Sequence, residues 1–196
     1  TNTNGDLAFQ TALGTPFTEF DFEQFVSEQQ ISTLNASGVS IEIRSLNPDG
    51  TVASSSGTIF DVTTWGTEPP EGVPGTIWKN VLTGSKRLEF VFSPPVKGFG
   101  AWLFDDGDAT QDEFSMTVVE AGGTTSTPEF LDAGNGYNYK VEGFLGAVSS
   151  VGIERVILNG QEVGGGTNGA AVEVDHVQVG AFPPLTIALH PCLTIR

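Results

Sequence analysis

The sequence predicts an all-β fold, an antiparallel β-sandwich of the jelly-roll type with about nine strands. Helical signals are nearly absent, because 25 Gly and 11 Pro interrupt the windows in which an amphipathic helix could form. Apolar and polar residues instead alternate in many short segments, which is typical of strands that bury one face. Turn sequences lie between these segments, among them Asn47-Pro48-Asp49-Gly50 and Asn159-Gly160.

The predicted strands follow one another along the chain. In order, they cover residues 17–25, 39–46, 57–62, 88–92, 98–104, 114–118, 139–144, 153–158 and 172–179. The alternation is clearest in Leu88, Phe90 and Phe92, which Glu89 and Val91 separate. We therefore expect one sandwich domain over residues 17–182, an N-terminal arm over residues 1–16, and a C-terminal arm or extra strand over residues 183–196.

The charge of the chain excludes two classes of partner. The sequence has 24 Asp and Glu but only 8 Lys and Arg, which gives a net charge of -16. Nucleic acid and anionic membranes would repel such a chain, and no apolar run is long enough to span a bilayer. We therefore expect no nucleic-acid partner and no membrane insertion. The single cysteine, Cys192, excludes a disulfide framework, and the acidic composition favours an extracellular or cell-surface location.

An acidic segment between two predicted strands is a candidate calcium site. Residues 105–113 read DDGDATQDE, and their oxygen donors recur at alternate positions, as in loops that wrap a hard cation. The candidate ligands are Asp105, Asp106, Asp108 and Asp112. The segment lacks the central Gly and the final Glu of an EF-hand loop, so an acidic hairpin loop without a metal is the alternative.

A second acidic pair, Glu23 and Asp175, lies in the first and the last predicted strands. The buried positions of the last strand change parity between Val174 and Val177, which predicts a β-bulge near Asp175. Asp175 has the parity of Val177 and is therefore expected to point inward. A carboxylate there is costly unless it is paired or bound to a metal. A hydrogen-bonded structural Asp at the end of a sheet is the alternative.

The sequence contains none of the common catalytic motifs that we considered. The sequence has no GxSxG, HExxH, P-loop or GxGxxG context, and its only histidines are His176 and His190. Paired carboxylates for glycoside hydrolysis stay open, because spacing along the chain does not select a pair. We expect a protein that is not an enzyme and has no catalytic residues.

The tryptophans are candidates for ligand contact. Trp65 and Trp78 flank the Pro- and Gly-rich segment Glu68–Gly75, and flat aromatic rings of this kind can stack on pyranose rings. Packing in the core or anchoring of the loop is the alternative for both. Trp102 lies between Ala101 and Leu103 in an apolar strand and is expected to pack in the core.

Several short motifs, taken in order, carry a resemblance. They are FDFE at residues 20–23, ISTL at 31–34, GV at 38–39, PVKGFG at 95–100 ahead of the acidic segment, GFLGAVSS at 143–150, IERV at 153–156 and VDHV at 174–177. This set resembles the exported bacterial β-sandwich proteins of the PEP-CTERM-associated type, which are similar to galactose-binding and carbohydrate-binding jelly rolls. The resemblance implies that an acidic residue of the first strand and one of the last hold a structural calcium. Glu23 and Asp175 match these positions, and His176 stands where the pattern has a second Asp.

These observations together predict a non-catalytic, extracellular and calcium-stabilised β-sandwich that acts as a binding module, with carbohydrate as its ligand. The alternative is a structural subunit of a surface layer, sheath or filament that assembles through its terminal arms. The expected partner is therefore a polysaccharide in the first case and a second copy of the chain in the other.

Overall fold

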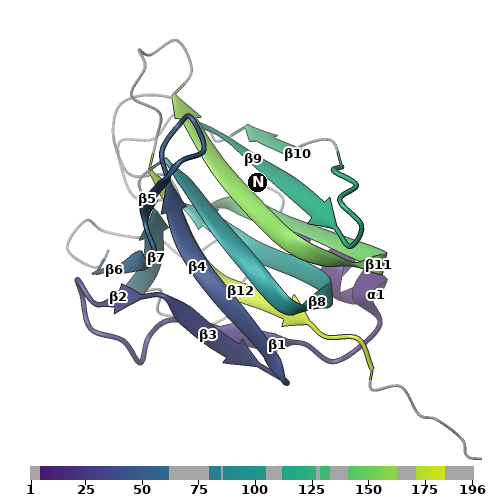
Figure 1. Ribbon diagram of the computed structural model, residues 1–196. Coiled ribbons are helices and arrows are strands. Elements are labelled where there is room, and N and C mark those ends of the chain that lie inside the picture. The colour runs from purple at the N-terminus through teal and green to yellow at the C-terminus, as the bar shows by residue number, and fades with distance from the viewer. Residues whose placement is uncertain are drawn as a thin grey trace, which may run out of the picture.

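The computed structural model describes residues 5–61, 80–84, 86–104, 112–126, 129–132, 141–162 and 171–183. The fold is an antiparallel β-sandwich with one short helix (Figure 1), and the predicted fold class is confirmed. The elements in chain order are α1 (Gly5–Leu13), β1 (Thr18–Phe20), β2 (Gln30–Ile31), β3 (Thr33–Ala36), β4 (Val39–Leu46), β5 (Val52–Ser54), β6 (Gly57–Asp61), β7 (Asn80–Gly84), β8 (Arg87–Phe104), β9 (Asp112–Glu120), β10 (Glu129–Asp132), β11 (Val141–Glu162) and β12 (Val172–Gly180).

Two long strands, β8 and β11, take part in both layers of the sandwich. The first half of β8 pairs with β4 and with the second half of β11, whereas the second half of β8 pairs with β12 and with the first half of β11. The pairing of β8 with β4 ends at Ser93, next to Pro94 and Pro95, which have no N–H to donate to a ladder. The sequence predicted each of these strands as two separate segments, and the structure shows each as one.

We call one layer the covered layer, because the helix α1 packs on its outer face, and the other the open layer. The open layer has the order β3-β4-β8-β11-β9-β10, with β5 paired to β4. The covered layer has the order β11-β8-β12-β7-β6-β2, and β1 pairs with the end of β12.

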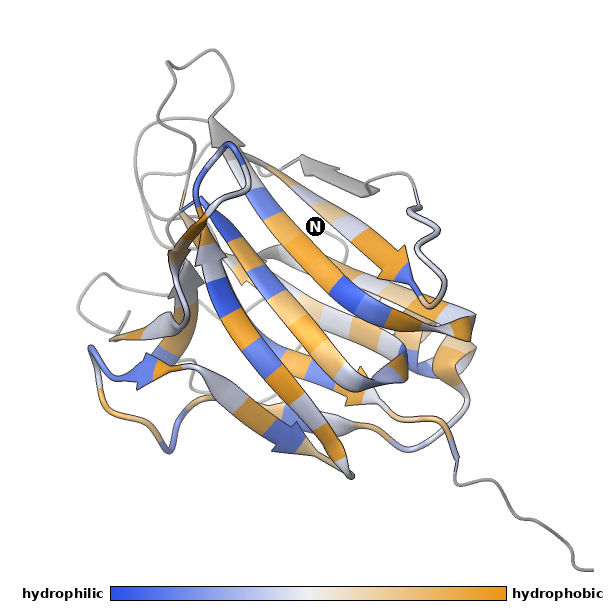
Figure 2. Ribbon diagram, viewed as in Figure 1, coloured by the Kyte–Doolittle hydropathy of each residue, from blue (hydrophilic) through white to orange (hydrophobic). Residues whose placement is uncertain are grey.

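The core lies between the layers and is built by alternation along the strands. On β4, Ile41 and Ile43 are fully buried, whereas the residues between and beside them are more exposed. On β8, Phe90 packs against Phe99 with ring centroids 4.9 Å apart. Figure 2 shows the alternating apolar and polar bands along the strands of the open layer.

The helix α1 covers the outer face of the covered layer, and the sequence did not predict it. Phe9 and Leu13, four residues apart, lie on the buried side of the helix and form a second apolar cluster with Val81, Trp102 and Phe144. The prediction that Trp102 packs inside the protein is confirmed, although its cluster lies under the helix rather than between the layers. Among the described residues, no helix has the length and apolar character needed to cross a membrane.

Glycines in the strands allow the helix to approach the sheet. A Cβ at Gly180 would lie 2.6 Å from the side chain of Leu13, and a Cβ at Gly100 would lie 2.3 Å from the ring of Phe144. Gly98 and Gly146 are similarly restricted by the side chains of α1. A glycine inside a strand often marks such a close approach, and this is the signal in the sequence that could have indicated the covering helix.

The first predicted strand is shorter than expected. β1 ends at Phe20, and Phe22 has a φ of 54°, which is the left-handed region. The amide of Phe25 donates to the carbonyl of Phe22 at 3.0 Å and closes a turn. The alternation in FDFE therefore reflects the burial of Phe22 in a turn and not a continued strand, and this turn carries Glu23 to the neighbourhood of β7.

Candidate functional site

The structure brings Glu23 and Asp175 to the same region of the covered layer. Asp175 lies on β12 opposite Trp102 of β8, so it shares the outer face of this layer with that ring. The Oε1 atom of Glu23 accepts a hydrogen bond from the backbone N–H of Asn80, the first residue of β7, at 3.2 Å. Glu19 and Asp21 also lie close enough for their charges to act on Asp175. We call Glu19, Asp21, Glu23 and Asp175 the acid site.

The predicted bulge in β12 is confirmed. The pairing of β12 with β8 shifts register between Asp175 and Gln178, and His176 has a φ of 46°. The bulge changes the parity of the strand, so that Val174 and Val177 both face the core while Asp175 faces outward from the layer. The prediction that Asp175 shares the face of Val177 is therefore wrong. Its side chain is nevertheless fully buried, with a relative exposure of 0%.

Only one oxygen of the Asp175 carboxylate has a hydrogen-bond donor. Its Oδ1 accepts a hydrogen bond from the backbone N–H of His176 at 2.6 Å. Among the described residues, its Oδ2 has no hydrogen-bond partner, and it lies 3.8 Å from Nε2 of His176. A buried carboxylate oxygen without a donor is unfavourable when the group is ionised, because it has lost its water without a replacement.

The surroundings of Asp175 disfavour its negative charge. Burial raises the pKa of Asp175 well above its usual range, and the charges of Glu23, Asp21 and Glu19 raise this pKa further. The hydrogen bond from the N–H of His176 lowers the pKa of Asp175, and this effect is smaller than that of burial. The site therefore favours either a proton on Asp175 or a cation beside it.

Glu19, in contrast, has polar partners on both carboxylate oxygens. Its Oε1 lies 3.1 Å from Nδ1 of His176, and its Oε2 accepts a hydrogen bond from Nε2 of Gln178 at 3.0 Å. The hydrogen bond with His176 is the main reason why the pKa of Glu19 is lowered. Gln178 is bonded in turn to Gln10 of α1 at 3.3 Å, so the polar contacts of the acid site extend to the covering helix.

The donor atoms of the acid site suit a hard cation. Carboxylate oxygens are the ligands that calcium prefers, and calcium takes main-chain oxygens and water as further ligands. Among the described residues, no group of three or more His, Cys, Asp or Glu could hold a metal ion. A cation at this site would therefore rely on Asp175 and Glu23 together with ligands other than acidic side chains. The unpartnered Oδ2 of Asp175 fits this arrangement.

The other predicted site residues lie outside the part that the structure describes. Asp105, Asp106 and Asp108 fall in the segment between β8 and β9, and Trp65 and Trp78 fall in the segment between β6 and β7. Asp112 is the first residue of β9, but its side chain is not among those described. The calcium loop and the tryptophan platform therefore stay predictions.

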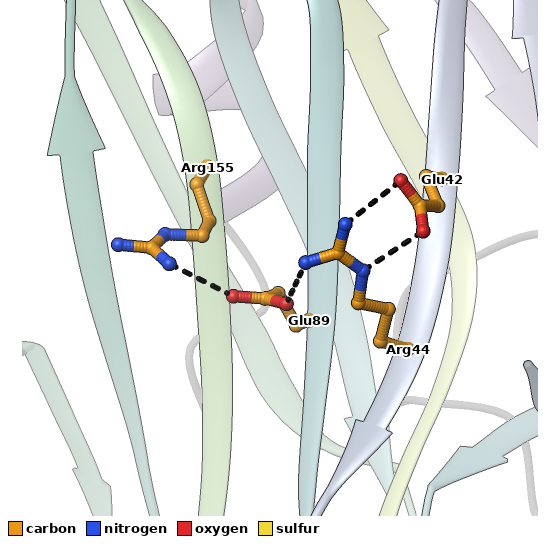
Figure 3. A network of polar contacts seen from close by, with 4 residues as sticks. All are labelled: Glu42, Arg44, Glu89 and Arg155. Carbon is orange, nitrogen blue, oxygen red and sulfur yellow. Dashed lines mark hydrogen bonds and ion pairs between the residues drawn. The ribbon is translucent and has the colours of Figure 1, made fainter. Parts of the chain in front are cut away.

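A second buried carboxylate, which the sequence analysis missed, lies on the outer face of the open layer (Figure 3). Glu89 of β8 is 3% exposed and lies between two arginines, with its Oε2 3.3 Å from Arg44 and its Oε1 3.3 Å from Arg155. Arg44 also contacts Glu42 at 2.9 Å through two nitrogens. A charged residue inside the apolar run LEFVF indicates that Glu89 has charged partners. The identity of these partners, Arg44 and Arg155, depends on the register of three strands.

Comparison with solved structures finds β-sandwich proteins. A DUF4465 family protein from Bacteroides caccae is similar with a TM-score of 0.52 and 8% sequence identity, over 86% of this chain and 100% of that one. TmCBM61, solved with β-1,4-galactotriose, is similar with a TM-score of 0.36 and 9% identity, over 72% of this chain and 88% of its own.

The CBM22-1 xylan-binding domain from Paenibacillus barcinonensis Xyn10C is similar with a TM-score of 0.28 and 10% identity, over 85% of this chain and 94% of its own. No family model and no curated protein matches the chain. The link to PEP-CTERM-associated proteins stays a prediction. The similarity to the Bacteroides caccae protein is one of fold, and it extends over the whole of that protein.

Proposed function

We propose that the protein is a non-catalytic, extracellular module that binds carbohydrate, and that calcium stabilises its sandwich. The observation that carries the calcium part of this proposal is the fully buried Asp175, which is surrounded by other carboxylates and whose Oδ2 has no hydrogen-bond partner among the described residues. A divalent cation there would offset the repulsion among these carboxylates. It would also join the segment after β1 to the last strand, which is far away in the sequence.

The burial of the acid site supports a structural role for its carboxylates. A glycosidase needs two carboxyl groups on either side of a cleft that admits the sugar. Asp175 has the raised pKa that a general acid needs, but its exposure is 0%, so a substrate has no access to it. His176, the histidine of the described part of the chain, is held by Glu19 and lies in the same region. These observations favour binding over catalysis.

The extracellular setting and the ligand class have separate support. Extracellular calcium is abundant enough to fill sites of modest affinity, which suits a site with few acidic ligands. Carbohydrate is supported by the predicted platform of Trp65 and Trp78 and by an uncharged, hydroxyl-lined groove at the edge of the sandwich. In a chain with a net charge of -16, an uncharged surface is suited to a neutral ligand.

Calcium content and glycan retention test the two parts of the proposal. Elemental analysis of the intact chain, after exchange into calcium and gel filtration, should show a calcium ion that Asp175→Asn loses. The matched control is Glu154→Gln, which removes an exposed charge of β11 and should keep the metal. An equal metal content in the two variants would contradict a calcium at Asp175. The wild-type chain should be retained on at least one immobilised polysaccharide, and failure across a broad panel would contradict the ligand class.

A further inference from the structure

A groove lies where the edge of the open layer meets the edge of the covered layer. It has a volume of about 430 Å³, and β4, β5, β6 and β7 contribute its walls. Small-molecule sites usually range from about 300 to 1,000 Å³, so the groove has room for a sugar ring.

The side chains of this groove are hydroxyls without charge. Those that line it are Ser45, Ser54, Ser56, Thr58 and Thr83, with alanine and glycine between them. None of the described residues that line the groove is charged, although the chain has 24 acidic residues. The groove therefore offers hydrogen bonds to a ligand without attracting or repelling a charge.

Four of the polar side chains that form and support the groove are linked by hydrogen bonds that run in one direction. Ser56 Oγ donates to Oε1 of Gln30 at 2.6 Å, and Nε2 of Gln30 donates to Oγ1 of Thr58 at 2.8 Å. Ser54 Oγ lies 2.9 Å from Ser56 Oγ. A hydroxyl has one hydrogen, and that of Ser56 is given to Gln30, so Ser54 is the donor in the contact with Ser56.

One end of this chain of hydrogen bonds can accept a further hydrogen bond, and the other end can donate one. At one end, the oxygen of Ser54 has given away its hydrogen and still has lone pairs that accept. At the other end, the hydroxyl of Thr58 accepts from Gln30 and can still donate its own hydrogen. The hydroxyls of a sugar ring each donate and accept, so adjacent hydroxyls can satisfy an acceptor and a donor at once.

We infer that this groove binds a neutral sugar ring, with Ser54 and Thr58 in direct contact with its hydroxyls. Gln30 and Ser56 act as positioning residues that set the direction of the hydrogen bonds. The inference rests on the proposed carbohydrate-binding function and names its site and the charge of its ligand. Sugars that carry a carboxylate bind more weakly, because the net charge of -16 repels them and none of the described residues that line the groove is a cation.

The test is an NMR titration of the intact chain in calcium buffer. The probes are the methyl β-pyranosides of galactose, glucose and xylose, with galacturonate as the anionic comparison. Thr58→Val keeps the shape of the side chain and removes the donor, so it should weaken binding of the neutral probe by about tenfold. The control is Thr117→Val on β9, a half-buried threonine outside the groove, which should leave binding unchanged.

The outcomes separate the site from the function. A neutral sugar that binds wild type and the Thr117→Val variant equally, but the Thr58→Val variant more weakly, supports the groove. Binding that Thr58→Val does not change, or a preference for galacturonate, overturns it and leaves the carbohydrate function standing. If wild type is retained on no polysaccharide and binds no probe, both fail. Should Thr58→Val not fold, the wild-type titration decides, because the amide shifts must centre on residues 54–58 and 83–84.

Discussion

Each of the two outer faces of the sandwich has a buried carboxylate next to other charged residues, Glu89 on one and Asp175 on the other, and the two carboxylates have opposite surroundings. On the open layer, Glu89 is 3% exposed and contacts Arg44 and Arg155, one at each oxygen. On the covered layer, Asp175 is 0% exposed, and its Oδ2 has no hydrogen-bond partner while three other carboxylates act on it. The first carboxylate is neutralised by the chain itself. The surroundings of the second favour a proton or a cation from the solvent, and this difference is what makes Asp175, and not Glu89, the candidate metal ligand.

The largest effect on stability is expected where the helix α1 packs on the covered layer. Phe9 is 5% exposed and packs on Phe144 with ring centroids 5.6 Å apart. We expect Phe9→Ala to lower the free energy of unfolding by about 3 to 5 kcal/mol, as for other large core aromatics. Urea denaturation followed by circular dichroism measures this change. Leu7→Ala, on the same helix but 63% exposed, is the control and should change the stability little. Equal effects of the two substitutions would show that α1 does not protect this face.

Calcium should stabilise the covered face and not the open one. A ligand present at about one hundred times its dissociation constant adds roughly 2.7 kcal/mol of stability. For a chain of this size, EDTA should therefore lower the melting temperature by about 5 to 11 °C. Asp175→Asn should remove this response, whereas Glu89→Gln should keep it. Sodium chloride at matched ionic strength controls for screening of the net charge. If sodium restores as much stability as calcium does, the metal is not specific to Asp175.

The calcium-free protein should also respond to pH through Asp175. The folded state raises the pKa of this carboxyl above that of the unfolded chain, so the folded state binds the proton more tightly. Between the unfolded and the folded pKa, stability therefore falls as pH rises. In EDTA, we expect acidification from about pH 7 to pH 5 to raise the melting temperature of wild type more than that of Asp175→Asn. Glu19 has the opposite effect on stability, because its pKa is lowered in the folded state. Its contribution to stability is lost as the pH falls towards this lowered pKa, below the pH range of this experiment.

The smallest effect is expected on the open face. Glu89→Gln removes the charge that Arg44 and Arg155 share, but both arginines are about a third or more exposed and stay solvated. The free energy of unfolding should therefore fall by only about 1 to 2 kcal/mol, as judged by urea denaturation. Glu42→Gln removes an exposed partner of Arg44 and should have no measurable effect. An effect of Glu42→Gln as large as that of Glu89→Gln would mean that burial is not what gives Glu89 its role.

The parts of the fold that depend on local alternation could be predicted from the sequence. The period-two pattern identified β4 and β9, and the change of parity between Val174 and Val177 predicted the bulge in β12. The face on which Asp175 lies could not be predicted in the same way, because a bulge makes parity on one side of it uninformative about the other. The pairing of Glu23 with Asp175 came from strand order and the resemblance, and the structure places both in one region.

The remaining features depend on contacts between distant segments. The helix α1 has only nine residues, and it is the glycines of β8, β11 and β12 that give Phe9 and Leu13 a place to pack. The ion pairs of Glu89 likewise require β4, β8 and β11 to be in register. The strand glycines and the charge in LEFVF are local signals, but neither of them identifies the distant segment that packs there. The hydroxyl groove was missed for the same reason, since its serines and threonines come from four strands and from the bend between β5 and β6.

The continuity of β8 and β11 determines how this sandwich comes apart. Because each of these strands has one half in either layer, neither layer can separate from the other without breaking backbone pairing in both. A pulling force applied to the open layer is carried along the covalent backbone into the covered layer, where the acid site lies. The two layers should therefore lose their structure in one cooperative event under mechanical load, without an intermediate in which one sheet survives alone.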